Sequence, residues 1–358
     1  MQFLPADFRD TFFKLGWYFV IKTLAVVGAT GAVGQIVLEE IQLQKLQYGR
    51  LRLLASQRSA GKQITVAGKT ITVEALAPEA FEGVDVVIAS TPDEVAAEFV
   101  PWAVQRGAIV VDESAFYRMD PQVPLVIPEV NPKAIDGHQG IIASPNCSTT
   151  QMVVALKPLY DAAGLKRVIV STYQAVSGAG LAAQEELVNN TQLQLSGAAQ
   201  QPSEFPYPIA FNLIPQIGSP KLEGFTSEEM KMVHETHKIM GDNTIQVNAT
   251  CIRVPVLIGH SESIYCETAE PLSLEKIREL FRNAPGVTLV DDLSRKQYPM
   301  PRDCANKSDV FVGRVRKDLN HPCGISFWCV SDNLRKGAAT NAVQIGKLLS
   351  DKFANVLA

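Results

Sequence analysis

Short apolar runs, rich in valine, isoleucine, leucine and alanine, recur through the first 150 residues of this 358-residue chain. Two longer stretches between them, 35–44 and 93–106, have the spacing of helices. Apolar strands that alternate with helices are typical of a parallel, doubly wound sheet, because crossover helices cover both of its faces. We therefore predict strands at 23–27, 51–55, 71–75, 84–89, 109–111 and 141–143.

The pattern changes after residue 147. A helix-like stretch at 151–163 leads to runs with alternating apolar positions, which are typical of strands buried on one face. The stretch 185–220 is rich in Gln, Asn, Ser and Pro and predicts helix ends and irregular connections, whereas 336–353 predicts a closing helix. We expect a mixed, largely antiparallel sheet with strands at 167–174, 246–254, 258–267, 310–316 and 324–330.

The length favours two domains rather than one. We expect one at 21–147 and a second at 148–335, with a C-terminal helix at 336–358 that joins the first domain. Residues 1–20 mix aromatic and charged side chains and fit neither a signal peptide nor a membrane span. We predict that they are an appended or mis-assigned leader and that the true start lies near Val20.

Composition narrows the class of protein. The chain is 46% hydrophobic and 20% charged, as is usual for a globular protein in water. The net charge of −4 gives no electrostatic case for binding nucleic acid or an anionic membrane. The six cysteines form neither a C-x-x-C pair nor a metal-ligand spacing, so we expect no metal and a reduced, cytoplasmic location.

A glycine turn follows the first predicted strand and precedes a helix. Its spacing, Gly28-x-x-Gly31-x-x-Gly34, departs from G-x-G-x-x-G, but its place between strand and helix is the one that a dinucleotide site requires. Thr30, Ala32 and Val33 complete the candidate cofactor contacts of this turn. The alternative is a glycine-rich turn that binds nothing.

The end of the second strand selects the dinucleotide. An NAD site usually has an acid here, for the ribose 2′-hydroxyl. This chain has Ser56, Arg58 and Ser59 and no acid between residues 55 and 62. Hydroxyls and cations suit a 2′-phosphate, so we predict NADP rather than NAD. The alternative is a solvated basic turn.

Cys147 lies where a strand-like run gives way to a helix-like run. A thiol at a helix N-terminus faces N–H groups and the positive end of the dipole, which favours the reactive thiolate. The same N–H groups could stabilise an oxyanion on an attacked carbonyl. The alternative is a small buried apolar residue, as most cysteines are.

A thiolate nucleophile needs an acid or base nearby. Among the five histidines, His260 shares a short apolar segment with Arg253, which places an imidazole and a cation in one neighbourhood. The alternative is a structural histidine and a surface arginine.

Five motifs together resemble the aspartate-β-semialdehyde dehydrogenase family, from about Thr23 to the C-terminus. They are the glycine turn 28–34, Ser-Pro-Asn-Cys-Ser-Thr at 144–149, Tyr-Gln-Ala-Val-Ser-Gly-Ala-Gly at 173–180, Arg-Val-Pro at 253–255 with His260, and Asp-Asn-Leu-Arg-Lys-Gly-Ala-Ala at 332–339. The resemblance implies an α/β protein with an N-terminal Rossmann-type NADP-binding domain and an α+β catalytic and dimerisation domain.

The family reduces L-4-aspartyl phosphate to L-aspartate 4-semialdehyde with NADPH, through an acyl-thioester. The product feeds the biosynthesis of lysine, diaminopimelate, methionine, threonine and isoleucine. The resemblance also implies a homodimer.

The resemblance assigns roles to individual residues. Cys147 becomes the acyl-thioester nucleophile and His260 the acid/base. Gln174 orients the substrate, Arg253 pairs with its α-carboxylate, and Glu228 binds its amino group.

Further residues are assigned to phosphate and cofactor. Arg118, aligned on Arg-Met-Asp at 118–120, and Lys231, three residues after Glu228, become the phosphate-binding cations. Ser177, Gly178 and Asn333 become contacts to the nicotinamide half of the cofactor.

Two other functions remain open. An N-acetyl-glutamyl-phosphate reductase shares the glycine turn and a cysteine nucleophile, but Arg253, His260 and the context of Cys147 favour the first family. A non-catalytic NADP-binding module would be expected to have lost the nucleophile or the substrate pocket, and every expected position is occupied.

Overall fold

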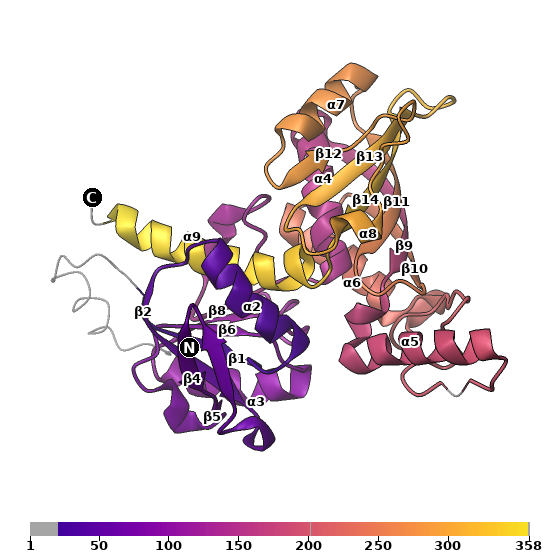
Figure 1. The fold of residues 1–358 in the computed structure, drawn as a ribbon. Helices are drawn as coiled ribbons and strands as arrows, with labels where there is room; N and C mark the ends of the chain where they lie inside the picture. Colours follow the sequence, from indigo (N-terminus) through magenta and orange to yellow (C-terminus); the bar gives the residue numbers. More distant parts are fainter. Residues whose placement is uncertain (1–20, 201, 357–358) are drawn as a thin grey trace. The chain divides into compact units, whose positions relative to one another are not determined.

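The structure, a computed structural model, describes residues 21–200 and 202–356 (Figure 1). Two compact units make up the described chain. The first comprises residues 21–144 and 339–356, and the second comprises residues 145–338. The expected leader, residues 1–20, lies outside the described residues. No described helix has both the length and the apolar character needed to cross a membrane.

The first unit is built on a parallel sheet, as predicted. Its strand order is β5-β2-β1-β6-β7-β8, and every neighbouring pair is parallel. The central strands are apolar because both of their faces are buried, and Leu24, Val26 and Ile88 have no exposed surface. The strands are β1 (Ile21–Val27), β2 (Tyr48–Ala55), β5 (Glu74–Ala75), β6 (Val86–Ala89), β7 (Ile109–Asp112) and β8 (Ile141–Ala143).

Among the described residues, three helices cover this sheet: α2 (Ala32–Leu43), α3 (Asp93–Gln105) and α9 (Thr340–Val356). The last of these returns from the C-terminal end of the chain to pack beside α2 and against β6 and β7 (Figure 1). Ala342 and Val343 of α9 are fully buried in the same apolar cluster as Leu24 and Val37.

The predicted strand at 71–75 is wrong in one respect. The chain forms a hairpin of β3 (Gln63–Val66) and β4 (Lys69–Thr72), and only Glu74–Ala75 joins the main sheet. Ala67 and Gly68 both have positive φ, 48° and 77°, as a tight hairpin turn requires. The hairpin strands are mostly exposed, so β3 has no apolar run that would reveal it.

The second unit contains the expected mixed sheet, in the order β10-β9-β11-β14-β13-β12. The pairs β9–β11, β11–β14 and β14–β13 are antiparallel, whereas β10–β9 and β12–β13 are parallel. The strands are β9 (Leu165–Gln174), β10 (Gln246–Arg253), β11 (His260–Thr268), β12 (Val287–Leu289), β13 (Val310–Lys317) and β14 (Gly324–Ser331).

Helices α4 (Cys147–Ala163), α6 (Ser227–Met240) and α7 (Leu274–Asn283) pack against this sheet. The remaining helices of the unit are α5 (Leu181–Ser196) and the short α8 (Pro301–Cys304). The prediction of irregular structure from residue 185 was wrong up to Ser196, because α5 is continuous. Its Ala183, Leu187 and Asn190 are buried at helical spacing, and Gly197, in the left-handed conformation, ends it.

Candidate active site

Cys147 is the first residue of α4, four residues before the predicted start of that helix. Asn146 caps the helix: its Oδ1 accepts the N–H groups of Ser148 and Thr149 at 3.0 and 3.3 Å. The pattern of apolar residues does not indicate this first turn of α4, because Ser148 to Thr150 are polar although they are buried. These two N–H groups serve the cap, so they are not the oxyanion donors that the sequence suggested.

Cys147 is partly exposed, and four of the other five described cysteines are buried. Burial raises the pKa of the Cys266 and Cys304 thiols to about 12 and also raises that of Cys251 and Cys329. A neutral buried thiol is a poor nucleophile, so these four cysteines are not candidates for the reaction.

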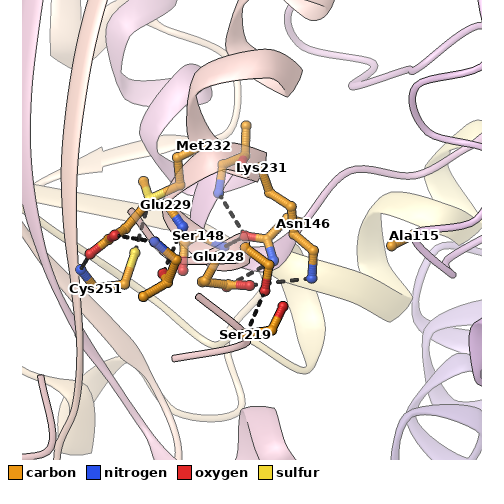
Figure 2. Close-up of polar contacts among 12 residues, drawn as sticks. Ala115, Asn146, Ser148, Ser219, Glu228, Glu229, Lys231, Met232 and Cys251 are labelled. Atoms are coloured by element: carbon orange, nitrogen blue, oxygen red, sulfur yellow. Dashed lines mark hydrogen bonds and ion pairs between the residues drawn. The ribbon is translucent and has the colours of Figure 1, made fainter. Parts of the chain in front are cut away.

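Helix α6 supplies two carboxylates to Asn146. Glu228 Oε1 accepts Asn146 Nδ2 at 2.9 Å, and Glu235 Oε2 accepts the Asn146 main-chain N–H at 2.7 Å. The α6 helix begins with a capping box, in which Thr226 and Glu229 satisfy each other's main-chain N–H groups. Figure 2 shows Asn146 and Lys231 next to Glu228.

Glu228 is ionised although it is buried. Burial raises its pKa, but Lys231 at 3.4 Å, the bonds from Asn146 and Gln174, and the charge of Arg253 together bring the pKa below its usual value. Glu228 and Lys231, three residues apart on α6, lie on the same helix face and form an ion pair (Figure 2). The Lys231 side chain remains 35% exposed and can meet a ligand.

The ends of three neighbouring strands bring together Gln174, Arg253 and His260. Gln174 and Arg253 are register partners at the ends of the parallel strands β9 and β10. His260 begins the antiparallel β11, whose second residue pairs with Tyr173. Because β11 runs opposite to β9, its start lies at the same edge of the sheet where β9 and β10 end.

One residue, Ala175, holds both the cation and the imidazole. Its carbonyl accepts Arg253 Nη1 at 2.7 Å, and its N–H donates to His260 Nδ1 at 3.0 Å. Burial lowers the pKa of His260 well below its usual value, and Arg253 lowers it further. His260 is therefore neutral, and its proton lies on Nε2 because Nδ1 is an acceptor.

His260 Nε2 is buried and has no hydrogen-bond partner among the described residues. A side chain at Gly178 would place its Cβ 3.2 Å from this nitrogen and 3.0 Å from Arg253 Nη1. The backbone at Gly178 therefore lies so close to the cation and the imidazole that a side chain there would clash with both. Burial also lowers the pKa of Arg253, whereas Cys147 and Glu228 raise it.

Gln174 connects this edge of the sheet to the nucleophile helix. Its Nε2 donates to Ser148 Oγ at 2.7 Å and to Glu228 Oε1 at 3.3 Å. Gln174 and Glu228 are both buried. The Gln174 amide thus contacts the residue that directly follows Cys147 in the chain.

Asn333 ties the turn 176–179 to the segment that precedes His260. Its Nδ2 donates to Ser177 Oγ at 3.0 Å, and its Oδ1 accepts the Gly259 N–H at 3.0 Å. The proposed nicotinamide contacts Ser177, Gly178 and Asn333 are thereby gathered with His260 in the second unit.

The first unit contains the glycine turn. Gly28 has φ of +81°, and a Cβ there would lie 2.1 Å from the Ser90 carbonyl oxygen. A Cβ at Gly34 would lie 2.1 Å from the Gly28 carbonyl oxygen. No side chain caps α2 at Gly31. The turn is thus a bare backbone cradle at a helix N-terminus, which fits the pyrophosphate of a dinucleotide.

The predicted 2′-phosphate residues lie on a short 3-10 turn after β2. Ser59 is buried, with its Oγ 3.4 Å from Thr30 Oγ1 of the glycine turn, whereas Ser56 and Arg58 are exposed. Arg118 belongs to the same unit, where its guanidinium donates to the carbonyls of Ser144 and Glu113 at 2.9 and 2.6 Å.

The sequence reading missed three residues of the site: Asn146, Glu235 and Gly337. Asn146 could have been recognised as a helix cap from its place before Cys147. A Cβ at Gly337 would lie 2.7 Å from Cys147 Cβ, so the turn at 332–338 packs directly on the nucleophile. Within the described residues, no group of three His, Cys, Asp or Glu side chains could hold a metal ion.

Comparisons with known proteins identify the family of this chain. Residues 23–138 match the model of the semialdehyde dehydrogenase NAD binding domain, and residues 156–336 match that of the semialdehyde dehydrogenase dimerisation domain. An aspartate-semialdehyde dehydrogenase from Bacillus subtilis (strain 168) is 51% identical over 334 residues, which cover 91% of this chain and 96% of the relative.

Two solved structures are also similar. Aspartate semialdehyde dehydrogenase II from Vibrio cholerae, described as complexed with ASA, has a TM-score of 0.90 and 45% identity, with 92% of this chain and 98% of that chain covered. An aspartate semialdehyde dehydrogenase with NADP from Candida albicans has a TM-score of 0.73 and 28% identity, with 94% and 99% covered.

Proposed function

Because this chain belongs to the aspartate-semialdehyde dehydrogenase family, we propose that it reduces L-4-aspartyl phosphate to L-aspartate 4-semialdehyde and inorganic phosphate, with NADPH as reductant. The product feeds the synthesis of lysine, diaminopimelate, methionine, threonine and isoleucine. The observation that carries the proposal is Cys147 at a helix start, in one unit with the buried Arg253 and His260.

Cys147 supplies the nucleophile. Its thiolate attacks the acyl carbon, the carbon–oxygen bond to phosphate breaks, and a thioester remains on the sulfur. When bound, a nicotinamide cofactor supplies hydride for the thioester carbon. The resulting oxyanion then re-forms its carbonyl and expels the thiolate, which releases the aldehyde and restores Cys147.

Substrate recognition rests on opposite charges. Arg253 suits the α-carboxylate, because its planar guanidinium can pair with two oxygens at once. The ionised Glu228 suits the amino group. Gln174 bonds both to Glu228 and to Ser148, so it links the substrate-binding carboxylate to the nucleophile helix. Lys231 and Arg118 are the proposed cations for the leaving phosphate.

His260 acts at the carbonyl oxygen. Neutral His260 presents a buried N–H at Nε2, close to the backbone of Gly178. We assign this N–H as a donor to the oxygen that becomes negative when Cys147 or hydride adds to the carbon. The Ser148 and Thr149 N–H groups do not stabilise this oxyanion, because they donate to the Asn146 cap. His260 takes this role instead.

NADP is the proposed cofactor. The backbone cradle at Gly28–Gly34 fits the pyrophosphate, and Ser56, Arg58 and Ser59 fit a 2′-phosphate without a competing acid. The Candida albicans enzyme described with NADP supports the same choice.

A homodimer is the proposed assembly. The family model that covers residues 156–336 is that of a dimerisation domain. Ile169 of β9 is 44% exposed, and Tyr173, on the same face of the strand, packs against Trp328 with ring centroids 5.5 Å apart. Sedimentation of the purified chain at about the mass of a monomer would contradict this assembly.

The direct test is phosphate-dependent formation of NADPH from L-aspartate 4-semialdehyde. NAD⁺ is run beside NADP⁺, and N-acetylglutamate 5-semialdehyde beside the aspartate compound. We expect turnover with the aspartate compound and preference for NADP⁺. Faster turnover of the acetylated substrate would favour the N-acetyl-glutamyl-phosphate reductase, and no turnover of either would favour a non-catalytic module.

Replacement of the nucleophile tests the thioester. We expect Cys147→Ala to abolish turnover while NADPH still binds, as followed by quenching of intrinsic fluorescence. A kcat close to that of the wild type would overturn the assignment of Cys147.

A further inference from the structure

Glu235 is a buried carboxylate that the proposed reaction does not use. It is only 1% exposed, and its Oε2 accepts the main-chain N–H of Asn146 at 2.7 Å. Burial of a carboxylate costs free energy, so a folded protein retains one where its oxygens are hydrogen-bonded to useful groups. The group that Glu235 binds is one residue before the nucleophile.

Glu228 and Glu235 are seven residues apart on α6, which places them on the same face of the helix. Both reach Asn146, one through the side-chain amide and the other through the main-chain N–H. The Asn146 Oδ1 in turn accepts two N–H groups of α4. Asn146 is therefore held at three points, and the helix that starts at Cys147 is held through it.

We propose that Glu235 is a positioning residue for Cys147: by fixing the peptide N–H of Asn146 it sets the direction in which α4 starts and thus the place of the thiol. This inference rests on the proposed function, in which Cys147 is the nucleophile. Glu228 is also assigned to the substrate, whereas Glu235 has no assigned part in the reaction.

Reach and charge can be separated at this position. Glu235→Gln keeps the length of the side chain and one acceptor oxygen but removes the charge. Glu235→Asp keeps the charge but is shorter by one methylene and withdraws the oxygen from the Asn146 N–H. A misplaced nucleophile costs up to about 100-fold in rate. We expect kcat to fall about 10- to 100-fold in Glu235→Asp, whereas Glu235→Gln retains most of it, with KM and the Kd for NADPH changed little in both variants.

The second readout does not depend on the proposed reaction. Iodoacetamide is added to the full-length protein at neutral pH, and alkylation of the Cys147 peptide is followed by mass spectrometry. We expect the rate constant to change several-fold in Glu235→Asp and to stay near the wild-type value in Glu235→Gln. If the wild type fails to turn over aspartate semialdehyde, the proposed function fails, while the alkylation rates still decide the role of Glu235.

Glu186 of α5 offers a matched control. It is also a buried carboxylate of the second unit that accepts main-chain N–H groups, those of Ser203 and Glu204 at 3.0 and 2.6 Å. Glu186→Asp and Glu186→Gln should leave both kcat and alkylation unchanged, whatever they cost in thermal stability.

The proposal requires that the kcat of Glu235→Gln be at least about five-fold higher than that of Glu235→Asp, with both variants folded as judged by circular dichroism. The reverse order would assign the role to charge and overturn it, and equal activity of the two variants would overturn it as well. If Glu235→Asp does not fold, Glu235→Gln must still retain wild-type alkylation, and a large change there would refute the proposal.

Discussion

Gly178 shows how the absence of a side chain contributes to the site. We expect Gly178→Ala to lower kcat/KM by roughly 10- to 100-fold, because the new Cβ displaces Arg253 Nη1 or His260 from its position. The backbone at Gly178 is outside the left-handed region, so alanine should fold there. Steady-state kinetics and a thermal melt together test this.

Gly137 provides the control for that substitution, because a Cβ there would meet no atom within 4 Å. Gly137→Ala should leave kcat/KM unchanged. An unaltered kcat/KM in Gly178→Ala would mean that the close approach of Gly178 to Arg253 and His260 does not matter for the reaction.

Arg58 is the residue that tests the choice of cofactor. Loss of a charge-assisted hydrogen bond costs about 1.5–3 kcal/mol, so we expect Arg58→Ala to weaken NADPH binding by about 10- to 100-fold. Binding of NADH should change little, since NADH lacks the 2′-phosphate. Titrations of both cofactors by fluorescence measure the two constants. Equal losses for NADPH and NADH would exclude the 2′-phosphate as the partner of Arg58.

Glu262 of β11 makes stability depend on pH. It is fully buried, neither carboxyl oxygen has a hydrogen bond of ordinary geometry within the described residues, and burial raises its pKa well above the usual value, against a smaller lowering by Gln151. The folded state therefore holds a proton that the unfolded state loses above about pH 4.3, the ordinary pKa of a glutamate. Stability falls as pH rises from there towards the folded pKa.

Replacement by the neutral amide removes this dependence. The free energy of unfolding of Glu262→Gln, relative to that of the wild type, should increase with each unit of pH above 5. Urea unfolding between pH 5 and 8 measures this difference. A difference that stays constant with pH would show that Glu262 is not the proton-binding group.

At the scale of elements, the cap of α4 depends on a donor as well as an acceptor. Asn146→Asp can still accept the Ser148 and Thr149 N–H groups, but it loses the Nδ2 donor to Glu228 and adds a third carboxylate beside Glu228 and Glu235. We expect a loss of roughly 1–3 kcal/mol in the free energy of unfolding at neutral pH, from the lost bond to a charged group.

Asn146→Ser keeps a capping oxygen without a charge and serves as the comparison. In urea unfolding at pH 7, the free energy of unfolding of Asn146→Asp should be lower than that of Asn146→Ser. If Asn146→Asp were as stable as the wild type, the carboxylates of α6 would have no effect on the cap.

Apolar runs revealed most elements, because strands buried on both faces carry no polar positions. The hairpin β3–β4 was missed because its strands are largely exposed, and α5 because its Gln and Asn residues resemble a loop. The start of α4 was placed at residue 151 because Ser148, Thr149 and Thr150 are polar, yet all three are buried. Because these residues are polar, their burial leaves no hydrophobic signal in the sequence.

At the scale of the whole molecule, residues with reactive or charged side chains can be proposed from sequence more readily than the residues that position them. Residue type and motif were enough to propose roles for Cys147, His260 and Arg253. The role that we propose for Glu235 could not be predicted, because it depends on the packing of α6 against α4. Glu235 and its partner Asn146 are 89 positions apart in the sequence. The order of the second sheet was likewise hidden, since β9 pairs with both β10 and β11 over long stretches of chain.

The bond from the Ala175 amide to His260 Nδ1 has one more consequence. A doubly protonated imidazole has a hydrogen on each nitrogen and accepts from neither. Any moment at which His260 carries a positive charge must therefore release the Ala175 amide. In deuterium oxide, the exchange rate of the Ala175 amide hydrogen should therefore follow the rate at which the imidazole becomes charged. Exchange of this one backbone hydrogen thus reports proton movement at His260.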